Sequence, residues 1–245
     1  MCSATIPAVA GVRLWFRFHG ELNDFLALAR RNVEFEHIAG ITDTAKHVIE
    51  SLGVPHTEVG RVTVNGEIHP LSEPLARGDH VHIFPHATPV VLRSPRFVVD
   101  GHLGRLAAYL RMLGFDTWYE RLAGDALLAA IASSEQRLLL TRDVGLLKRR
   151  EVLQGYCVRS DKPNDQLREV SGRFALSLHF APFTRCMDCN GPLSPVSKNE
   201  VADLLPPHTR ETKNEFSRCL NCGKVFWRGS HHARMLGWIQ ALAGR

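Results

Sequence analysis

The sequence lacks any long hydrophobic run. Its 245 residues contain no apolar stretch close to the roughly 18 residues that a membrane-spanning helix needs. The first residues, MCSATIPAVAG, have neither a basic leader nor a long apolar core, which argues against a secretory signal. These two absences predict a cytoplasmic protein without a membrane partner.

Cysteine is scarce, but its placement is informative. Four of the six cysteines form two C-x-x-C pairs, CMDC at 186–189 and CLNC at 219–222, with 29 residues between them. In a chain without a signal peptide such pairs favour metal binding over disulfides. Four thiolates close the coordination shell, so we expect one structural zinc ion in a zinc ribbon, with redox activity and iron–sulfur ligation as weaker alternatives. The predicted ligands are Cys186, Cys189, Cys219 and Cys222.

Acidic residues are fewer than basic residues only in the second part of the chain. Residues 1–90 carry 7 basic against 10 acidic side chains, a balance of −3, whereas residues 91–245 carry 23 against 15, a balance of +8. The whole chain has a net charge of +5. A basic surface attracts polyanions, although many basic surfaces bind nothing. The distribution therefore favours a polyanion partner for the second part alone.

The first segment, residues 11–90, has the pattern of a small α+β domain. Its expected strands are VRLWFRF, VEFEHIAG, RVTVNGEIHP with an Asn-Gly turn, and GDHVHIFP. Between them ITDTAKHVIESLGV predicts a helix with Thr42 or Asp43 as N-cap and Gly53 at its end. Strand, strand, helix and then strands is the order of a β-grasp fold.

The second segment, residues 95–183, follows a proline-containing linker, HATPVVLRSP. Here short apolar strands alternate with helical patterns: FVVD, GRLAAYLRMLG, FDTWYE, GDALLAAIASSE, RLLLTRD, VGLLKRR, GYCVRS and NDQLREVSGRF. Such repetition predicts an α/β domain with a parallel sheet covered on both faces. Ligands of such sheets bind at the carboxyl ends of the strands.

Aspartates stand at these strand ends. Asp100 and Asp143 each follow an apolar strand, and Asp125 begins the intervening helix. Converging carboxylates repel one another unless a cation lies between them, and oxygen ligands of this kind suit magnesium or manganese. Each aspartate also has a local interpretation. Asp125 and Asp143 are good N-caps, whereas GHLG after Asp100 is no obvious helix start.

The third segment, residues 184–245, contains the cysteine pairs and closes with VFWRGSHHARMLGWIQAL, a strand followed by a helix. Phe226 and Trp227 are expected in the ribbon core. His231 is a candidate for an RNA contact or a structural hydrogen bond.

Several of these motifs together carry a resemblance. FVVDGHLGRLAAYLRMLGFDTWYE, GDALLAAIA, RLLLTRDVGLLKRR and CMDCNGPLSPVSKNEV…CLNCGKVFWRGSHHARM resemble the Mut-seven C-terminal RNase family, over residues 96 to about 236. The resemblance implies a PIN-like nuclease fold with an appended zinc ribbon and metal-dependent cleavage of RNA. Asp100, Asp125 and Asp143 match the acidic positions of the family, and Arg105, Arg111 and Arg142 match the basic ones. Asp161, with Asp165 behind it, is the best candidate for the fourth acid of a PIN nuclease.

The first segment resembles the ubiquitin-like domain that often precedes this nuclease, and also the sulfur carriers of thiamin and molybdopterin synthesis. Those carriers end in a free Gly-Gly, whereas here the chain continues as HATPVVLRSPRF. We therefore expect an adaptor that docks a protein partner, with sulfur transfer as the weakest hypothesis.

These observations predict a ribonuclease that cleaves phosphodiester bonds of single-stranded RNA with metal-activated water. The expected catalytic acids are Asp100, Asp125, Asp143 and Asp161; the expected RNA contacts are Arg105, Arg111, Arg142, Lys148, Arg149 and His231. The alternative is a non-catalytic RNA-binding or adaptor protein that uses the basic surface and the ribbon.

Overall fold

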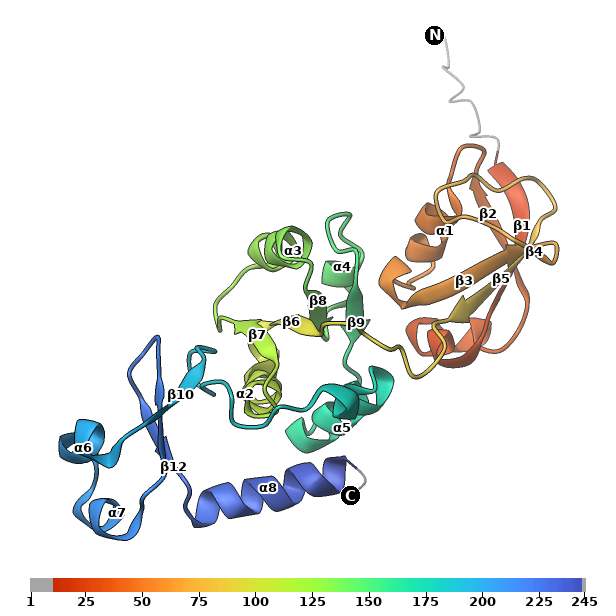
Figure 1. The fold of residues 1–245 in the computed structure, drawn as a ribbon. Coiled ribbons are helices and arrows are strands. Elements are labelled where there is room, and N and C mark those ends of the chain that lie inside the picture. The colour runs from red at the N-terminus through yellow and green to blue at the C-terminus, as the bar shows by residue number, and fades with distance from the viewer. Residues whose placement is uncertain (1–10, 244–245) are drawn as a thin grey trace. The chain divides into compact units, whose positions relative to one another are not determined.

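The computed structural model describes residues 11–243 (Figure 1). Contacts divide the chain into two compact units. Unit 1 holds the chain up to Ala87 together with Asp143–Cys157, and unit 2 holds Thr88–Arg142 and the chain from Val158 onward. Within the described residues, no helix is long and apolar enough to cross a membrane.

Unit 1 contains a β-grasp sheet, as predicted from the sequence. The strand order is β2-β1-β5-β3-β4, with β1 and β5 parallel and the other pairs antiparallel. The elements are β1 (Gly11–Phe18), η1 (Gly20–Phe25), η2 (Leu28–Arg30), β2 (Phe35–Gly40), α1 (Ala45–Ser51), η3 (His56–Glu58), β3 (Val59–Val64), β4 (Glu67–Ile68) and β5 (His80–Pro85).

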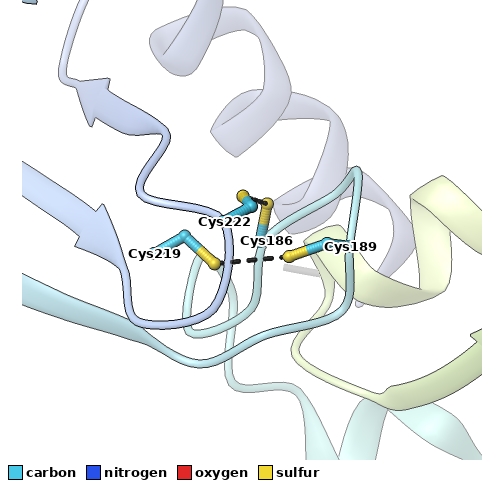
Figure 2. A group of neighbouring side chains, drawn as sticks. All are labelled: Cys186, Cys189, Cys219 and Cys222. Atoms are coloured by element: carbon cyan, nitrogen blue, oxygen red, sulfur yellow. Dashed lines mark hydrogen bonds between the residues drawn. The ribbon is translucent and has the colours of Figure 1, made fainter.

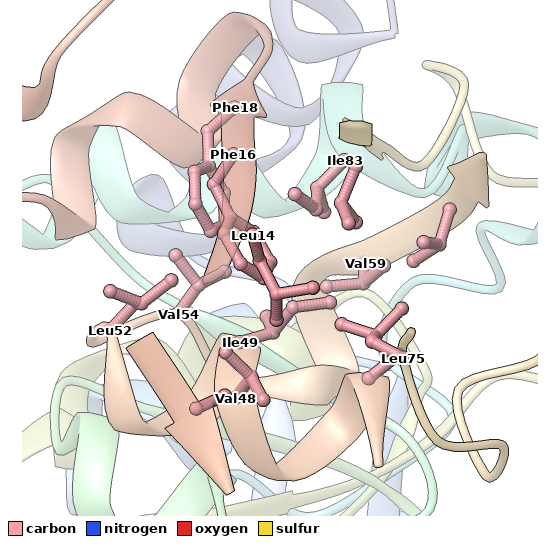
Figure 3. Close-up of a cluster of buried hydrophobic side chains, with 14 of the residues drawn as sticks. Leu14, Phe16, Phe18, Val48, Ile49, Leu52, Val54, Val59, Leu75 and Ile83 are labelled. Carbon is pink, nitrogen blue, oxygen red and sulfur yellow. The ribbon is translucent and has the colours of Figure 1, made fainter. Parts of the chain in front are cut away.

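Strict alternation along β1 separates a core face from an outer face. Val12, Leu14, Phe16 and Phe18 are at most 8% exposed, while the residues between them point away from the core. The buried side chains meet those of α1, such as Ile49, and form one cluster (Figure 3). Each fully buried Leu or Phe of this kind contributes about 1.5–3 kcal/mol. This one-sided burial leaves the other face of the sheet outside the core.

The ends of α1 confirm one local prediction and correct another. Thr44, and neither Thr42 nor Asp43, caps the helix by accepting a hydrogen bond from His47 N–H at 3.2 Å. The Asp43 carboxylate instead accepts from Gly40 N–H at 2.8 Å and so belongs to the turn after β2. Gly53, with φ of 114°, ends the helix as expected.

The Asn-Gly turn is confirmed. Asn65 and Gly66 have φ of 51° and 92°, as a two-residue turn between β3 and β4 requires.

Residues 143–157, which the sequence pattern assigned to the second segment, are part of unit 1. They contain α4 (Val144–Leu147), shorter than the helix expected over 144–150, and β9 (Gly155–Cys157). Cys157 N–H donates to the buried Glu58 carboxylate at 2.6 Å. Lys148 Nζ donates to the carbonyl of Glu50 at 2.7 Å. These hydrogen bonds attach the segment to the end of α1 and to η3.

Unit 2 contains the predicted parallel sheet. Its strands β7, β6 and β8 lie in that order, with β6 parallel to both neighbours. The elements are β6 (Arg96–Val99), η4 (Gly101–Leu103), α2 (Gly104–Met112), β7 (Asp116–Tyr119), α3 (Asp125–Ser134), β8 (Leu138–Thr141), α5 (Pro163–Arg173) and η5 (Leu176–His179). Central strand β6 is buried from Phe97 to Val99, which explains its uninterrupted apolar run.

The ribbon of unit 2 is a small antiparallel sheet of order β10-β11-β12. Its core is Val201, Leu205 and Phe216. The elements are β10 (Leu193–Val196), α6 (Lys198–Val201), η6 (Ala202–Leu204), α7 (Pro207–Thr212), β11 (Phe216–Cys219), β12 (Val225–Trp227) and α8 (Ser230–Leu242). The expectation that Phe226 and Trp227 form this core was wrong, since neither is in the buried cluster and Trp227 is 37% exposed.

Candidate functional site

The two C-x-x-C pairs come together at the ends of the ribbon strands (Figure 2). The four Sγ atoms lie within 4.8 Å of one another. Cys186 and Cys222 have their sulfurs 3.8 Å apart, and Cys189 and Cys219 have theirs 3.4 Å apart. Sulfurs at the roughly 2.3 Å bond length of a tetrahedral zinc site are about 3.8 Å from one another. The four cysteines therefore fit a tetrahedral metal such as zinc.

The thiols differ in their readiness to lose a proton. Burial raises the pKa of Cys186, and burial also raises the pKa of Cys189 to about 12. Burial acts against ionisation of Cys219 as well, but hydrogen bonds from the backbone N–H groups of Cys222 and Asn221 bring its pKa down to about 7. Metal ligation needs thiolates, and the backbone N–H groups around Cys219 favour that form.

Two cations lie beside the sulfurs. Arg111 of α2 is 5% exposed, and its guanidinium donates to the carbonyls of Thr117, Met187 and Asp188 at 3.0, 3.1 and 2.7 Å. Lys224 pairs with the Asp188 carboxylate. Burial lowers the pKa of Arg111, although the thiolates act to raise it. The hydrogen bond to Asp188 raises the pKa of Lys224, and the charges of Cys186 and Cys222 add to this effect. A tetrathiolate zinc site carries net negative charge, which these cations offset.

Arg111 corrects an RNA-contact prediction. Its buried guanidinium holds backbone carbonyls of the first cysteine knuckle, so it joins the ribbon to α2 and does not face a phosphate.

A second connection between the ribbon and the parallel sheet was missed from the sequence. Asn190, directly after Cys189, accepts from Thr117 N–H at 3.0 Å and donates to the Asp116 carboxylate at 2.7 Å. Arg137 also donates to Asp116, at 2.8 Å. Burial would raise the pKa of Asp116, but these hydrogen bonds hold it below its usual value. The sequence offered one signal for this connection, the amide side chain of Asn190 directly after the second cysteine of the first pair.

Asp100 lies where the sequence predicted it, at the carboxyl end of β6. Its side chain makes no helix-capping hydrogen bond, so helix capping does not account for an aspartate at this position. The residue is 9% exposed, and its Oδ2 accepts from Thr141 Oγ1 at 2.6 Å. Within residues 11–243 Asp100 has no ion pair. A buried carboxylate held by a hydroxyl alone is poorly compensated and favours the approach of a cation.

The glycines after Asp100 allow close packing at this strand end. A Cβ on Gly101 would lie 2.3 Å from the carbonyl oxygen of Arg121, and one on Gly104 would lie 2.5 Å from Tyr119 Oη. The Tyr119 hydroxyl donates to the carbonyl of Gly101 at 3.0 Å. The close contact of η4 and α2 with the end of β7 therefore explains why glycines occupy positions 101 and 104.

The other predicted acids have local roles. Asp143 caps α4, its Oδ1 accepting from the N–H groups of Gly145 and Leu146 at 2.6 and 3.3 Å. Asp125 is exposed at the first position of α3, where Gly124 and not Asp125 is the N-cap. Asp161 is exposed and pairs with Arg142 at 2.7 Å. Among the described residues, the four cysteines are the one group of three or more potential metal ligands within mutual reach.

The predicted RNA contacts have varied surroundings. Arg105 is exposed on α2, and Arg142 is exposed but paired with Asp161. In unit 1, Lys148 is partly buried against Glu50, and Arg149 lies 3.8 Å from Glu151. His231 is in α8, but its side chain lies outside the described part of the structure.

A cavity of about 710 Å³ lies between the ribbon sheet and the start of α8. Aromatic side chains line it, among them Phe183, Phe226 and Trp227. Its cations are engaged: Arg185 lies 3.6 Å from Asp116, Lys224 pairs with Asp188, and Arg228 pairs with Glu215 at 2.9 Å. The paired charges give this cavity no marked preference for an anion.

The topology and the cysteine cluster define a protein with a β-grasp domain, a parallel-sheet α/β domain and a four-cysteine ribbon. By comparison of sequences the chain belongs to the Mut7-C RNAse domain family, whose model matches residues 95–239. Residues 11–91 match the Mut7-C ubiquitin domain. The family confirms the resemblance found in the sequence.

Solved structures similar to the chain include two crystal structures of small archaeal modifier protein 1 from Haloferax volcanii. Each covers 31% of this chain at 18% identity, with TM-scores of 0.26 and 0.25, and the matches span 100% and 96% of those chains. Curated proteins gave no significant match.

Proposed function

We propose that the chain is a metal-dependent ribonuclease that hydrolyses phosphodiester bonds of single-stranded RNA. Family membership supports a nuclease. The observation that carries the metal dependence is the environment of Asp100, buried at the end of the central strand with Thr141 as its hydrogen-bond donor. A divalent cation would relieve the cost of burying this charge.

Asp100 is the proposed carboxylate ligand, and Asp143 is the second acid to be tested by mutation. Asp100 directly follows β6, and Asp143 lies two residues beyond the parallel neighbour β8. Magnesium often binds through one or two carboxylates, with waters and substrate phosphate completing its shell. A single carboxylate can therefore hold a metal that arrives with RNA, although the described residues gather no group of three acids. The bound ion would supply an activated water and neutralise phosphate charge.

The deciding experiment measures cleavage of labelled single-stranded RNA with and without manganese. Asp100→Asn keeps an oxygen that accepts from Thr141, so the fold should survive. Loss of an outer-shell partner of a metal site typically lowers activity by about 10- to 100-fold. Asp100 is proposed as a direct ligand, so its replacement should lower manganese-dependent cleavage by more than about 100-fold. Asp203→Asn is the matched control, because Asp203 is an exposed aspartate of the same unit that lies in the ribbon. Equal cleavage by parent and Asp100→Asn would remove Asp100 from the reaction.

A second candidate function is RNA binding without catalysis. It is favoured by the local roles of Asp143 and Asp161 and by the single ligand cluster among the described residues. Titration with manganese separates the two candidates. A nuclease shows a divalent site in addition to zinc, and Asp100→Asn weakens it; an adaptor shows zinc alone.

A further inference from the structure

The outer face of the β-grasp sheet gathers rings and cations across its three central strands. In β1 and β5 the buried residues alternate with outward ones, and Arg17 lies opposite His82 in the strand register. Arg61 of β3 lies opposite Phe84 of β5. We call this face the platform; it consists of Trp15, Arg17, Arg61, His80, His82 and Phe84.

The rings of the platform are stacked and partly exposed. Trp15 and His80 have centroids 6.0 Å apart with planes 13° from parallel. At the other end of the face, His19, which directly follows β1, stacks on Phe84 at 4.2 Å and 6°. The guanidinium of Arg61 lies over the same Phe84 ring, 4.4 Å from its centroid. Because His19 and Arg61 already lie on the Phe84 ring, the half-buried Trp15 is the ring on which a further flat ring can stack.

The two arginines of the platform have no acidic partner among the described residues, whereas His80 has one. Glu34 pairs with His80 and Glu36 pairs with Arg13, both near strand β2 at the edge of the sheet. Arg17 and Arg61 are exposed, and neither makes an ion pair within residues 11–243. Glu36 lies opposite Trp15 in the strand register, so these acidic side chains border the platform on its β2 side, across the sheet from Arg61 of β3. Two unpaired arginines beside stacked rings complement a ligand that has both phosphates and bases.

We propose that the platform binds single-stranded RNA, with a base stacked on Trp15 and phosphates paired with Arg17 and Arg61. This inference rests on the proposed function, because RNA is taken as the ligand on the ground that the same chain is proposed to cleave it. Sheet faces that combine aromatic and basic side chains hold unpaired bases in this way. An acidic protein surface would pair with the arginines but would not stack on the aromatic rings.

The test measures the affinity of the full chain for a labelled single-stranded RNA of about 12 nucleotides, within the usual site size of single-strand-binding folds. Divalent cations are left out so that the RNA stays intact. Arg17→Gln and Arg61→Gln should each weaken binding and lower the slope of log affinity against log salt by about 0.7, the value for one phosphate of a single strand. Trp15→Leu should weaken binding about fivefold or more without changing that slope, because a lost stacking contact is uncharged.

Arg77→Gln is the matched control, since Arg77 is an exposed arginine of the same domain that is not one of the six platform residues. It should leave the slope unchanged, and thermal unfolding should show all four variants folded. Unchanged affinity in the three platform variants would overturn the proposal and leave the face to an acidic protein partner. An equal loss in Arg77→Gln would overturn it too, because binding would then follow total charge alone.

Manganese-dependent cleavage by the same preparations separates this proposal from the proposed function. A parent that binds RNA through the platform but does not cleave it contradicts only the nuclease. A parent that cleaves RNA with no change of binding in the platform variants contradicts only the platform.

Discussion

The hydroxyl of Thr141 donates a hydrogen bond to the carboxylate of Asp100, with 2.6 Å between Oγ1 and Oδ2. Thr141 is the last residue of β8 and is fully buried, and Asp100 directly follows the parallel strand β6. The two side chains thus link the carboxyl ends of neighbouring strands, the place where sheets of this type bind their ligands.

Thr141→Val should show what this hydrogen bond contributes. The variant keeps the shape of the side chain but leaves the Asp100 carboxylate without its donor, so the free energy of unfolding should fall by about 1–3 kcal/mol. Urea unfolding measures the change. Thr141→Ser, which keeps the hydroxyl, should lose clearly less, and equal losses in the two variants would show that packing and not the hydrogen bond matters.

Asp143 can be separated into a capping role and a chemical one. Asp143→Asn retains an oxygen for the N–H groups of Gly145 and Leu146, whereas Asp143→Ala removes the cap at a cost of about 1 kcal/mol. If Asp143 also holds a metal, both variants should lose manganese-dependent cleavage, although only Asp143→Ala is destabilised. Full cleavage by Asp143→Asn would leave the residue with its cap alone.

The arginines of α2 should behave in opposite ways. Arg111→Ala leaves three backbone carbonyls of a buried region without their donor, so we expect a loss of about 2–5 kcal/mol in stability. Arg105→Ala removes an exposed side chain and should change stability by less than about 0.5 kcal/mol while weakening RNA binding. Thermal unfolding and RNA affinity, measured side by side, check both outcomes. A stable Arg111→Ala protein with weakened RNA binding would restore the original RNA-contact prediction.

Zinc content should depend on the ribbon thiols only. Cys219→Ser should lose the ion and unfold at a lower temperature, because a structural zinc site contributes folding free energy directly. Cys157→Ser is the control, since Cys157 lies outside the cluster. Elemental analysis should find one zinc per chain in the parent and in the control. Full zinc in Cys219→Ser would exclude this residue as a ligand.

Acid should destabilise unit 1 through two histidines. Burial is the main cause that lowers the pKa of His19 and His37 below 6.5, so the folded chain binds fewer protons than the unfolded chain just below that value. Stability then rises with pH in this range and is lost as the pH falls from about 6.5 through the lowered pKa values. Unfolding between pH 7 and 5 should show a smaller decline for His37→Gln than for the parent. An identical decline would assign the acid sensitivity to other groups.

Much of the fold could be predicted because its signals are local. Alternation along VRLWFRF marked the buried side of β1, the apolar run FVV marked a strand buried on both faces, and Asn65-Gly66 marked a turn that needs positive φ. The prediction failed where two local choices were nearly equal. Thr42, Asp43 and Thr44 can all cap a helix, and the position of the turn after β2 selected Thr44.

The candidate site was predictable only in part. The cysteine spacing identified the ribbon ligands, but four aspartates of similar sequence context proved to have different surroundings. Asp100 is buried with Thr141, Asp143 caps a helix and Asp161 pairs with Arg142. Likewise, helical spacing could not distinguish the buried Arg111 from the exposed Arg105.

The amino-acid sequence by itself determined the order of the domains, the pattern of buried and outward strand faces and the four thiolates of the ribbon, because these depend on neighbouring residues and on spacing along the chain. Only the tertiary structure decided which charged groups are neutralised by a partner. That depends on side chains distant in sequence, such as Thr141 beside Asp100 and the knuckle carbonyls around Arg111, whose approach is set by packing and which no local pattern records.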